Sequence, residues 1–151
     1  MPVHEIIAGL VARFLAEDRA KDAYEINCGS CQDFAEELVR ELDRQGLGSD
    51  ACEIWVDDLL LGEAMDDDRG QFDRVRIERD HPSLVPPEGL SWDDMDRLAE
   101  EYGFAGGTHV WVVIEGRHYD AEAPAGVDNA FDLPFFRRSI EDFLAARAAV
   151  P

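Results

Sequence analysis

Residues 27–35 read Asn-Cys-Gly-Ser-Cys-Gln-Asp-Phe-Ala, and a helical pattern begins directly after Ser30. Ser30 and Asp33 have the spacing of a capping box, in which a serine caps the helix and an acid at the third helical position bonds back to it. Apolar residues then recur at helical spacing on one face, while charged residues occupy the opposite face. The pattern predicts an amphipathic helix that starts at Cys31 and ends near Gly46.

The rest of the chain predicts a mixture of helices and strands around this helix. Further helices are predicted at residues 3–19, 91–102 and 136–149, and strands at residues 51–56, 72–79, 108–115 and 117–121. Residues 21–27 are interpreted as a connector, and Gly116 with Arg117 as a tight turn between the last two strands. This order predicts an α+β fold, in which the helix after Ser30 packs on a small antiparallel sheet.

The composition limits the classes of protein that the chain can represent. It has 151 residues, of which 46% are hydrophobic, enough for a single domain over residues 1–151. Fourteen basic and thirty-four acidic residues give a net charge of −20, which disfavours binding to nucleic acid. There is no apolar run of about 20 residues and no signal-peptide order at the start, so a cytoplasmic protein without a membrane partner is expected.

The three cysteines do not predict a disulfide framework or a metal site. Their number is odd and no export signal is evident, which favours thiols. Zinc would need ligands beyond Cys28 and Cys31, and Cys52 with His81 or His118 offers no second pair at ligand spacing. A redox motif of the Cys-x-x-Cys type would need a preceding strand, which the pattern lacks. We therefore expect no metal and no cofactor.

Three residues have the chemistry that a cysteine nucleophile requires. Cys31 is placed at a helix start, where unpaired N–H groups and the helix dipole lower a thiol pKa. His109 opens a predicted strand, and Asp120 lies in the strand that follows. An imidazole that takes the thiol proton and a carboxylate that orients the imidazole complete such a site. The sequence thus predicts Cys31, His109 and Asp120 as a catalytic set.

Other residues are candidates for supporting or alternative roles. The amides at the helix start, including that of Gln32, and the side-chain amide of Asn27 are candidate donors to an oxyanion. Cys28 is the alternative nucleophile, and His118 is the alternative base if the strand register differs by one pair. Glu122 is predicted to point to the same strand face as Asp120, so the orienting acid stays open between these two residues.

Two windows of the chain resemble a known superfamily. Residues 29–35 have the Gly-x-Cys-x-x-Phe-Ala form found at the nucleophile of transglutaminase-like proteins, a branch of the papain-like cysteine peptidases. Residues 109–112 resemble the His-x-Trp-x strand of that family, and residues 117–120 resemble its following, aspartate-bearing strand. The chain is also similar to small phage-type bacterial proteins of this superfamily, which share an Asn-Cys-Gly start and a Tyr-Asp-x-Glu-x-Pro-x-Gly-Val finish.

The resemblance implies a transglutaminase-like α+β domain with an insertion at about residues 59–107. It implies Cys31 as nucleophile, His109 as general base and Asp120 as orienting acid, acting on amide or ester bonds of a peptide or related substrate. In the family the aspartate usually stands further beyond the histidine, whereas Asp120 follows His109 by only eleven residues. The alternative interpretation is an inactive acidic binding or accessory protein of the same fold, which engages a basic partner.

Overall fold

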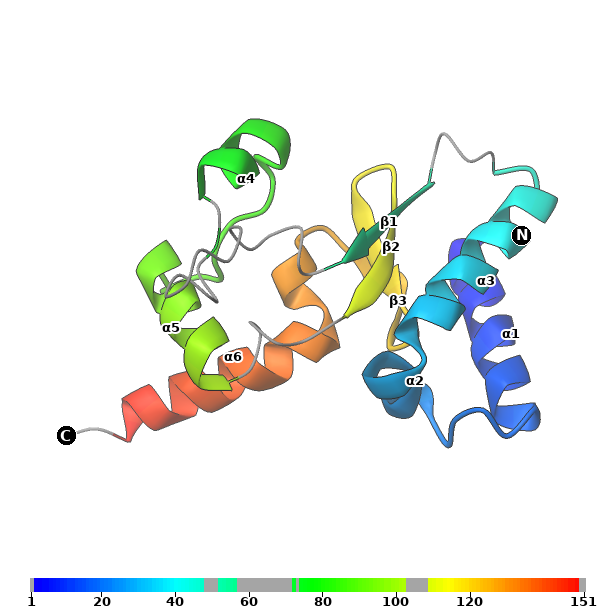
Figure 1. Cartoon of the computed structure of the whole chain (residues 1–151), viewed down its shortest axis with the longest axis horizontal. Helices are drawn as coiled ribbons and strands as arrows, with labels where there is room; N and C mark the ends of the chain where they lie inside the picture. The colour runs from blue at the N-terminus through cyan, green and yellow to red at the C-terminus, as the bar shows by residue number, and fades with distance from the viewer. Residues whose placement is uncertain (1, 48–51, 57–71, 73, 103–108, 150–151) are drawn as a thin grey trace, which may run out of the picture. The chain divides into compact units, whose positions relative to one another are not determined.

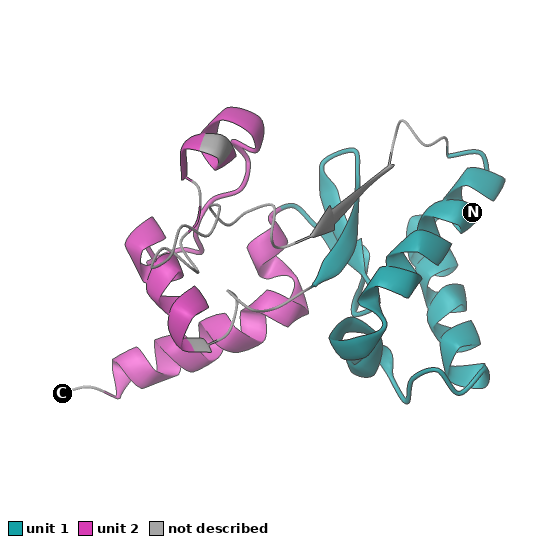
Figure 2. Ribbon diagram, in the orientation of Figure 1, with its two compact units in different colours: residues 1–56, 109–128 teal, residues 57–108, 129–151 magenta. Residues whose placement is uncertain are grey.

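The chain divides into two compact units (Figure 2). The computed structural model describes residues 2–47, 52–56, 72, 74–102 and 109–149, and for residues 52–56, 76 and 102 it describes the backbone alone. The first unit comprises Met1–Val56 and His109–Asp128, and the second comprises Asp57–Thr108 and Asn129–Pro151. The predicted insertion at residues 59–107 falls within the second unit. Over the described residues, no helix combines the length and the apolar composition that crossing a membrane requires.

The first unit is an antiparallel sheet with helices on one face (Figure 1). Its elements are α1 (Val3–Ala16), α2 (Ala23–Gly29), α3 (Cys31–Arg44), β1 (Cys52–Val56), β2 (Val110–Ile114), β3 (Arg117–Asp120) and β4 (Ala123–Val127). The strands are hydrogen-bonded in the order β1-β2-β3-β4, and all three pairings are antiparallel. The prediction of an α+β fold with a small antiparallel sheet is confirmed at this level.

The core of the first unit positions α3 against β2. Helix α1 contributes residues at helical spacing, α3 contributes its apolar face, and β2 contributes every second residue. The buried members of these three elements are Ile6, Ile7, Leu10, Phe14, Phe34, Ala35, Leu38, Leu42, Val110, Val112 and Ile114. The rings of Phe14 and Phe34 meet edge to face with centroids 5.4 Å apart. Because this packing holds α3 on the sheet, it also fixes the position of the α3 N-terminus.

A two-residue turn joins β2 and β3. Glu115 and Gly116 have φ values of 50° and 82°, as a type I′ hairpin turn requires. The predicted turn at Gly116 and Arg117 is therefore wrong by one residue, since Arg117 is already the first residue of β3. Within the hairpin Val112 lies opposite Tyr119, and Val113 lies opposite His118.

Strand β4 was not predicted, because its sequence contains a proline and a glycine that usually interrupt strands. It forms at the end of the sheet, where a missing N–H is tolerated. The guanidinium of Arg117 holds it in place by donating to the carbonyls of Ala125 and Gly126, at 3.1 and 2.8 Å, and to Asp128 at 2.7 Å. A single long side chain from β3 thus stabilises an otherwise poor strand.

Among the glycines in the described part of the chain, Gly126 is the one whose replacement is expected to cost most. Its φ is 78°, and a Cβ there would lie 2.6 Å from a ring carbon of Tyr119. Gly126→Ala is therefore expected to lower the free energy of unfolding by about 3 kcal/mol, as backbone strain adds to the ring contact. Gly46→Ala is the matched control, because Gly46 has a φ of 91° but nothing within 4 Å of a Cβ. It should cost only about 1 kcal/mol in the same urea unfolding experiment; equal losses would contradict the role of Tyr119.

Two further predictions of secondary structure are wrong. Residues 21–27 are not a connector, since most of them form α2, which Asp22 caps by accepting from the Glu25 N–H at 2.9 Å. Residues 72–79 are not an edge strand, because α4 (Arg74–Asp80) occupies most of them. In that segment Ile77 is 2% exposed while Val75 is 75% exposed, so the two apolar residues do not share a face as a strand would require.

The second unit contains α4, α5 (Trp92–Tyr102), the 3₁₀ helix η4 (Ala130–Asp132) and α6 (Pro134–Ala148). Ser91 and Asp94 cap α5 reciprocally: Ser91 Oγ accepts from the Asp94 N–H at 3.1 Å, and Asp94 accepts from the Ser91 N–H at 2.9 Å. Phe131 packs edge to face on Phe72 and Phe136.

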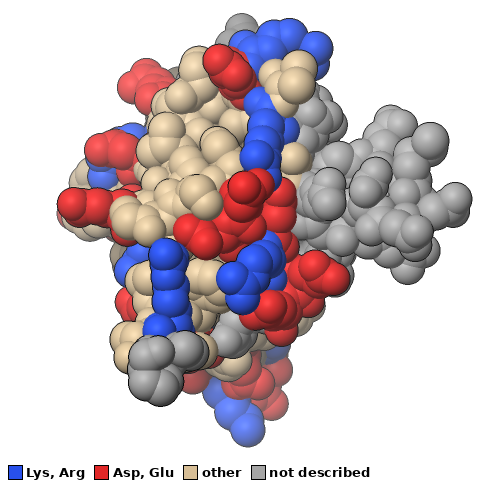
Figure 3. Space-filling view, turned by 90° about the vertical axis from the view of Figure 1, so that its left-hand side faces the viewer, with Lys and Arg blue, Asp and Glu red and all other residues tan. Residues whose placement is uncertain are grey.

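On the face shown in Figure 3, acidic and basic side chains are interspersed among uncharged ones, so the negative charge does not form an unbroken surface there.

Candidate functional site

Cys31 is the first residue of α3, and the side chain of Ser30 does not cap this helix. Ser30 is the N-cap residue, but its side chain makes no capping hydrogen bond, so the predicted capping box with Asp33 does not form. The physical reason is that Ser30 also ends α2, and its φ of −129° and ψ of 18° are not the extended geometry of an N-cap serine. The prediction that the helix begins at Cys31 is confirmed.

Cys31 is partly buried and lies beside His109. Burial raises the pKa of this thiol, but a hydrogen bond with His109, the positive charge of that residue, and the backbone amides of Val110 and Gln32 lower it. The lowering contributions prevail, so the pKa of Cys31 lies below its ordinary value. The side chain of Gln32 bonds to Glu36 at 3.3 Å, so Gln32 acts on the thiol through its backbone.

His109 directly precedes β2 and is fully buried. Its Nε2 lies 2.9 Å from Asp120 Oδ2, and its ring stacks on Trp111 with centroids 5.7 Å apart. Burial lowers the pKa of His109, whereas the hydrogen bonds and charges of Asp120 and Cys31 raise it, with a net result of about 9. The two shifts act together: the lowered pKa of Cys31 favours the thiolate, and the raised pKa of His109 favours the imidazolium.

Asp120 is held on both of its oxygens. Oδ2 contacts His109, while Oδ1 accepts from the backbone N–H groups of Glu122 and Ala123, each at 2.9 Å. Asp120 as a whole is 2% exposed. Since β3 ends at Asp120 and the chain turns there into β4, Glu122 does not continue the strand. Of the two acids that the sequence leaves open, Asp120 is the one that contacts His109.

Glu122 has a different contact. Its Oε1 accepts a hydrogen bond from Asn27 Nδ2 at 2.8 Å, and Asn27 is itself only 2% exposed. Asn27 lies in α2, four residues before Cys31, and Glu122 lies in the turn that Asp120 organises. The bond thus ties the segment before the thiol to the turn that carries the carboxylate. One N–H of the Asn27 amide, predicted as an oxyanion donor, is engaged by Glu122.

The hydrogen bond between Asn27 and Glu122 can be tested by exchanging which of the two side chains donates and which accepts. Asn27→Asp places a second carboxylate against Glu122, and the loss is expected to be about 2–3 kcal/mol of unfolding free energy at neutral pH. Each carboxylate then raises the pKa of the other in the folded state, so this loss should diminish as the pH falls and one of them becomes protonated. Glu122→Gln alone keeps the acceptor and should cost little. The double variant Asn27→Asp with Glu122→Gln should recover most of the stability, and a double variant as unstable as Asn27→Asp would contradict the bond.

The alternative residues lie elsewhere. Cys28 is exposed on α2. His118, predicted as the alternative base, is buried, and its Nδ1 accepts from the Trp111 indole at 2.9 Å. The register that would exchange it with His109 is not observed, because His118 lies opposite Val113. In the described part of the chain no group of three His, Cys, Asp or Glu residues is arranged for a metal ion; the Cys52 side chain lies outside that part.

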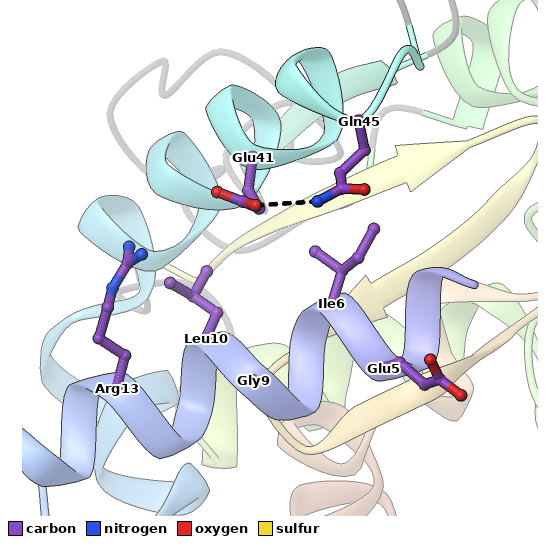
Figure 4. A pocket seen from close by; sticks show the side chains of 7 residues that line it. All are labelled: Glu5, Ile6, Gly9, Leu10, Arg13, Glu41 and Gln45. Carbon is purple, nitrogen blue, oxygen red and sulfur yellow. Dashed lines mark hydrogen bonds between the residues drawn. The ribbon is translucent and has the colours of Figure 1, made fainter. Parts of the chain in front are cut away.

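One contribution to the site has no signature in the sequence. The N–H of Val110 acts on the thiol as a backbone group, and any residue except proline would supply it at that position. A pocket of about 180 Å³ between α1 and α3 is separate from these residues (Figure 4). Its lining is Glu5, Ile6, Gly9, Leu10, Arg13, Glu41 and Gln45.

The site in the first unit is therefore a line of contacts from Cys31 through His109 to Asp120, with Asn27 and Glu122 beside it. Comparison of the chain with protein-family models, with curated proteins and with solved structures gave no match.

Proposed function

We propose that the chain is a cysteine hydrolase or acyltransferase of the transglutaminase-like, papain-like type. The observation that carries the proposal is the continuous contact from the Cys31 thiol to His109 and from His109 Nε2 to Asp120 Oδ2 at 2.9 Å. A buried carboxylate bonded to the far nitrogen of an imidazole that faces a thiol has the nucleophile, base and orienting acid of a catalytic triad.

Each group has one role in the proposed reaction. The Cys31 thiolate attacks the carbonyl carbon of an amide or ester, and the carbonyl oxygen becomes an oxyanion that the N–H groups at the start of α3 stabilise. His109 gives its proton to the leaving amine or alcohol as the C–N or C–O bond breaks, which leaves a thioester on Cys31. Water or an acceptor amine then attacks the thioester, loses a proton to His109, and releases the thiol. Asp120 keeps the imidazole in the tautomer and orientation that both steps need.

An activated ester tests the covalent step without knowledge of the natural substrate. Mixing the protein with p-nitrophenyl acetate should give a burst of p-nitrophenol equal to one equivalent of protein, followed by slower turnover. Trypsin cleavage after Lys21 and Arg40 gives a peptide of residues 22–40, and mass spectrometry should find one acetyl group on it. Glycinamide in the second phase separates the two reaction types, since a hydrolase yields acetate and an acyltransferase yields N-acetylglycinamide.

The matched control is Cys28→Ser, because Cys28 lies in the same tryptic peptide. This variant should keep the burst, whereas Cys31→Ser should lose it. A burst that depends on Cys28, or no burst at all with a folded protein, would contradict the proposal. The second of these results, together with salt-sensitive binding to a basic protein, would favour the acidic binding role instead.

A further inference from the structure

We infer that Cys28 and Cys31 are a peroxide-reactive dithiol, which closes to a disulfide and thereby masks the Cys31 nucleophile. The formation of this disulfide is independent of the proposed hydrolase or acyltransferase activity; only its effect on activity rests on that function. Neither residue is in a disulfide in the structure.

The backbone between the two cysteines brings them close together. Gly29 is the last residue of α2, and Ser30 follows with a φ of −129° and a ψ of 18°. A helical residue followed by one near ψ 0° has the order of the two central residues of a type I turn. The ends of such a turn have Cα atoms less than about 7 Å apart, close to the span that a disulfide bridges. Cys28 and Cys31 are these two ends.

The two thiols also differ in reactivity and exposure, as a pair of attacking and resolving thiols requires. Cys31 is partly buried against His109, and the contacts of its sulfur favour the thiolate, which is the form that peroxide oxidises. Cys28 is exposed near the end of α2, so it is accessible to a reductant. The result is an attacking thiolate next to an accessible partner thiol.

The chemistry balances with a peroxide as the oxidant. The Cys31 thiolate attacks one oxygen of hydrogen peroxide, the O–O bond breaks, and Cys31 becomes a sulfenic acid while hydroxide leaves and takes up a proton to form water. The Cys28 thiolate then attacks the Cys31 sulfur, the S–O bond breaks, and a second water leaves as the S–S bond forms. Two electrons pass from the dithiol to the peroxide. A dithiol reductant reverses the bond by thiol exchange.

Mass spectrometry of residues 22–40 tests the inference directly. In a Cys52→Ser background, which leaves only this pair, hydrogen peroxide should yield a tryptic peptide about 2 Da lighter, through loss of the two thiol hydrogens. Alkylation of Cys31 by iodoacetamide should fall at least about tenfold in the oxidised protein and return after dithiothreitol. With Cys28→Ser as well, the lighter peptide should be absent, and Cys31 should carry a dimedone-reactive sulfenic acid or proceed to sulfinic acid.

The outcomes distinguish this inference from the proposed function. A lighter peptide without an acetyl burst would support the dithiol and contradict the triad. A burst with Cys31 oxidised equally fast to sulfinic acid, whether or not Cys28 is present, would support the triad and overturn the dithiol. Oxidation in the Cys28→Ser protein that stops at a stable sulfenic acid, beside a disulfide in the parent protein, identifies Cys28 as the resolving thiol.

Discussion

Asp120→Asn is expected to lower the rate of Cys31 acylation by about 10³–10⁴-fold. The asparagine oxygen can still accept from the N–H groups of Glu122 and Ala123, as Asp120 Oδ1 does. Its NH₂ group then faces His109 Nε2, where the carboxylate oxygen lies at 2.9 Å in the parent protein. An NH₂ group there requires Nε2 to be an acceptor, so the ring proton moves to Nδ1 and points to the thiol. An imidazole in that tautomer cannot take the thiol proton.

The matched control for this change is Asp128→Asn. Asp128 is an exposed carboxylate in the same part of the chain, and it pairs with Arg117 at 2.7 Å. Its amide variant should leave the burst unchanged and shift stability by less than about 1 kcal/mol, as for other surface pairs. Asp120→Asn should keep the fold, because its turn contacts remain. A variant protein with normal acylation would show that the bond between His109 and Asp120 is structural only.

Cys31→Ala is expected to lower acyl transfer by about 10⁶-fold, the loss seen when a catalytic nucleophile is removed. Cys28→Ala is the matched control and should leave the rate unchanged, since Cys28 is an exposed thiol three residues away. The difference between these two variants assigns the nucleophile, because both remove one sulfur from the same peptide segment.

Titration of His109 in the Cys31→Ala variant shows whether its loss of activity comes from the missing thiol or from a folding defect. In the parent protein the imidazole should titrate with a pKa of about 9, followed by ¹H–¹⁵N NMR of the ring. Cys31→Ala removes a hydrogen bond and a negative charge that raise this pKa, so the midpoint should move to lower pH while the ring still contacts Asp120. An unchanged midpoint in a folded variant would mean that the thiol and the imidazole are not coupled.

Local signals predicted the elements that carry the three proposed catalytic residues. The helix from Cys31 follows from apolar spacing after Ser30, and the hairpin follows from alternating apolar residues on either side of Gly116. These signals are short-range, so a single sequence reveals them. They place Cys31 at a helix start, His109 at the start of a strand and Asp120 on the neighbouring strand.

The features that the sequence pattern did not predict depend mostly on contacts between residues further apart in the chain. Strand β4 depends on the Arg117 side chain, which bonds to carbonyls eight and nine residues away. The choice between Asp120 and Glu122 depends on where β3 ends, and the partner of Glu122 is 95 residues distant at Asn27. The capping box does not form because Ser30 is both the C-cap residue of α2 and the N-cap residue of α3. None of these facts is encoded in local periodicity.

The pH dependence of Cys31 alkylation is the most direct test of an activated thiol. Iodoacetamide reacts with the thiolate, so in a Cys28→Ser, Cys52→Ser background the rate rises with pH through the pKa of Cys31 alone. The structure predicts that the pKa of Cys31, and with it this midpoint, lies below the ordinary thiol value, because His109 and the backbone amides outweigh burial. In His109→Ala the opposing effect of burial remains, so the midpoint should move upward. A parent midpoint at or above about 8.5 that His109→Ala does not change would show an ordinary thiol and contradict the triad.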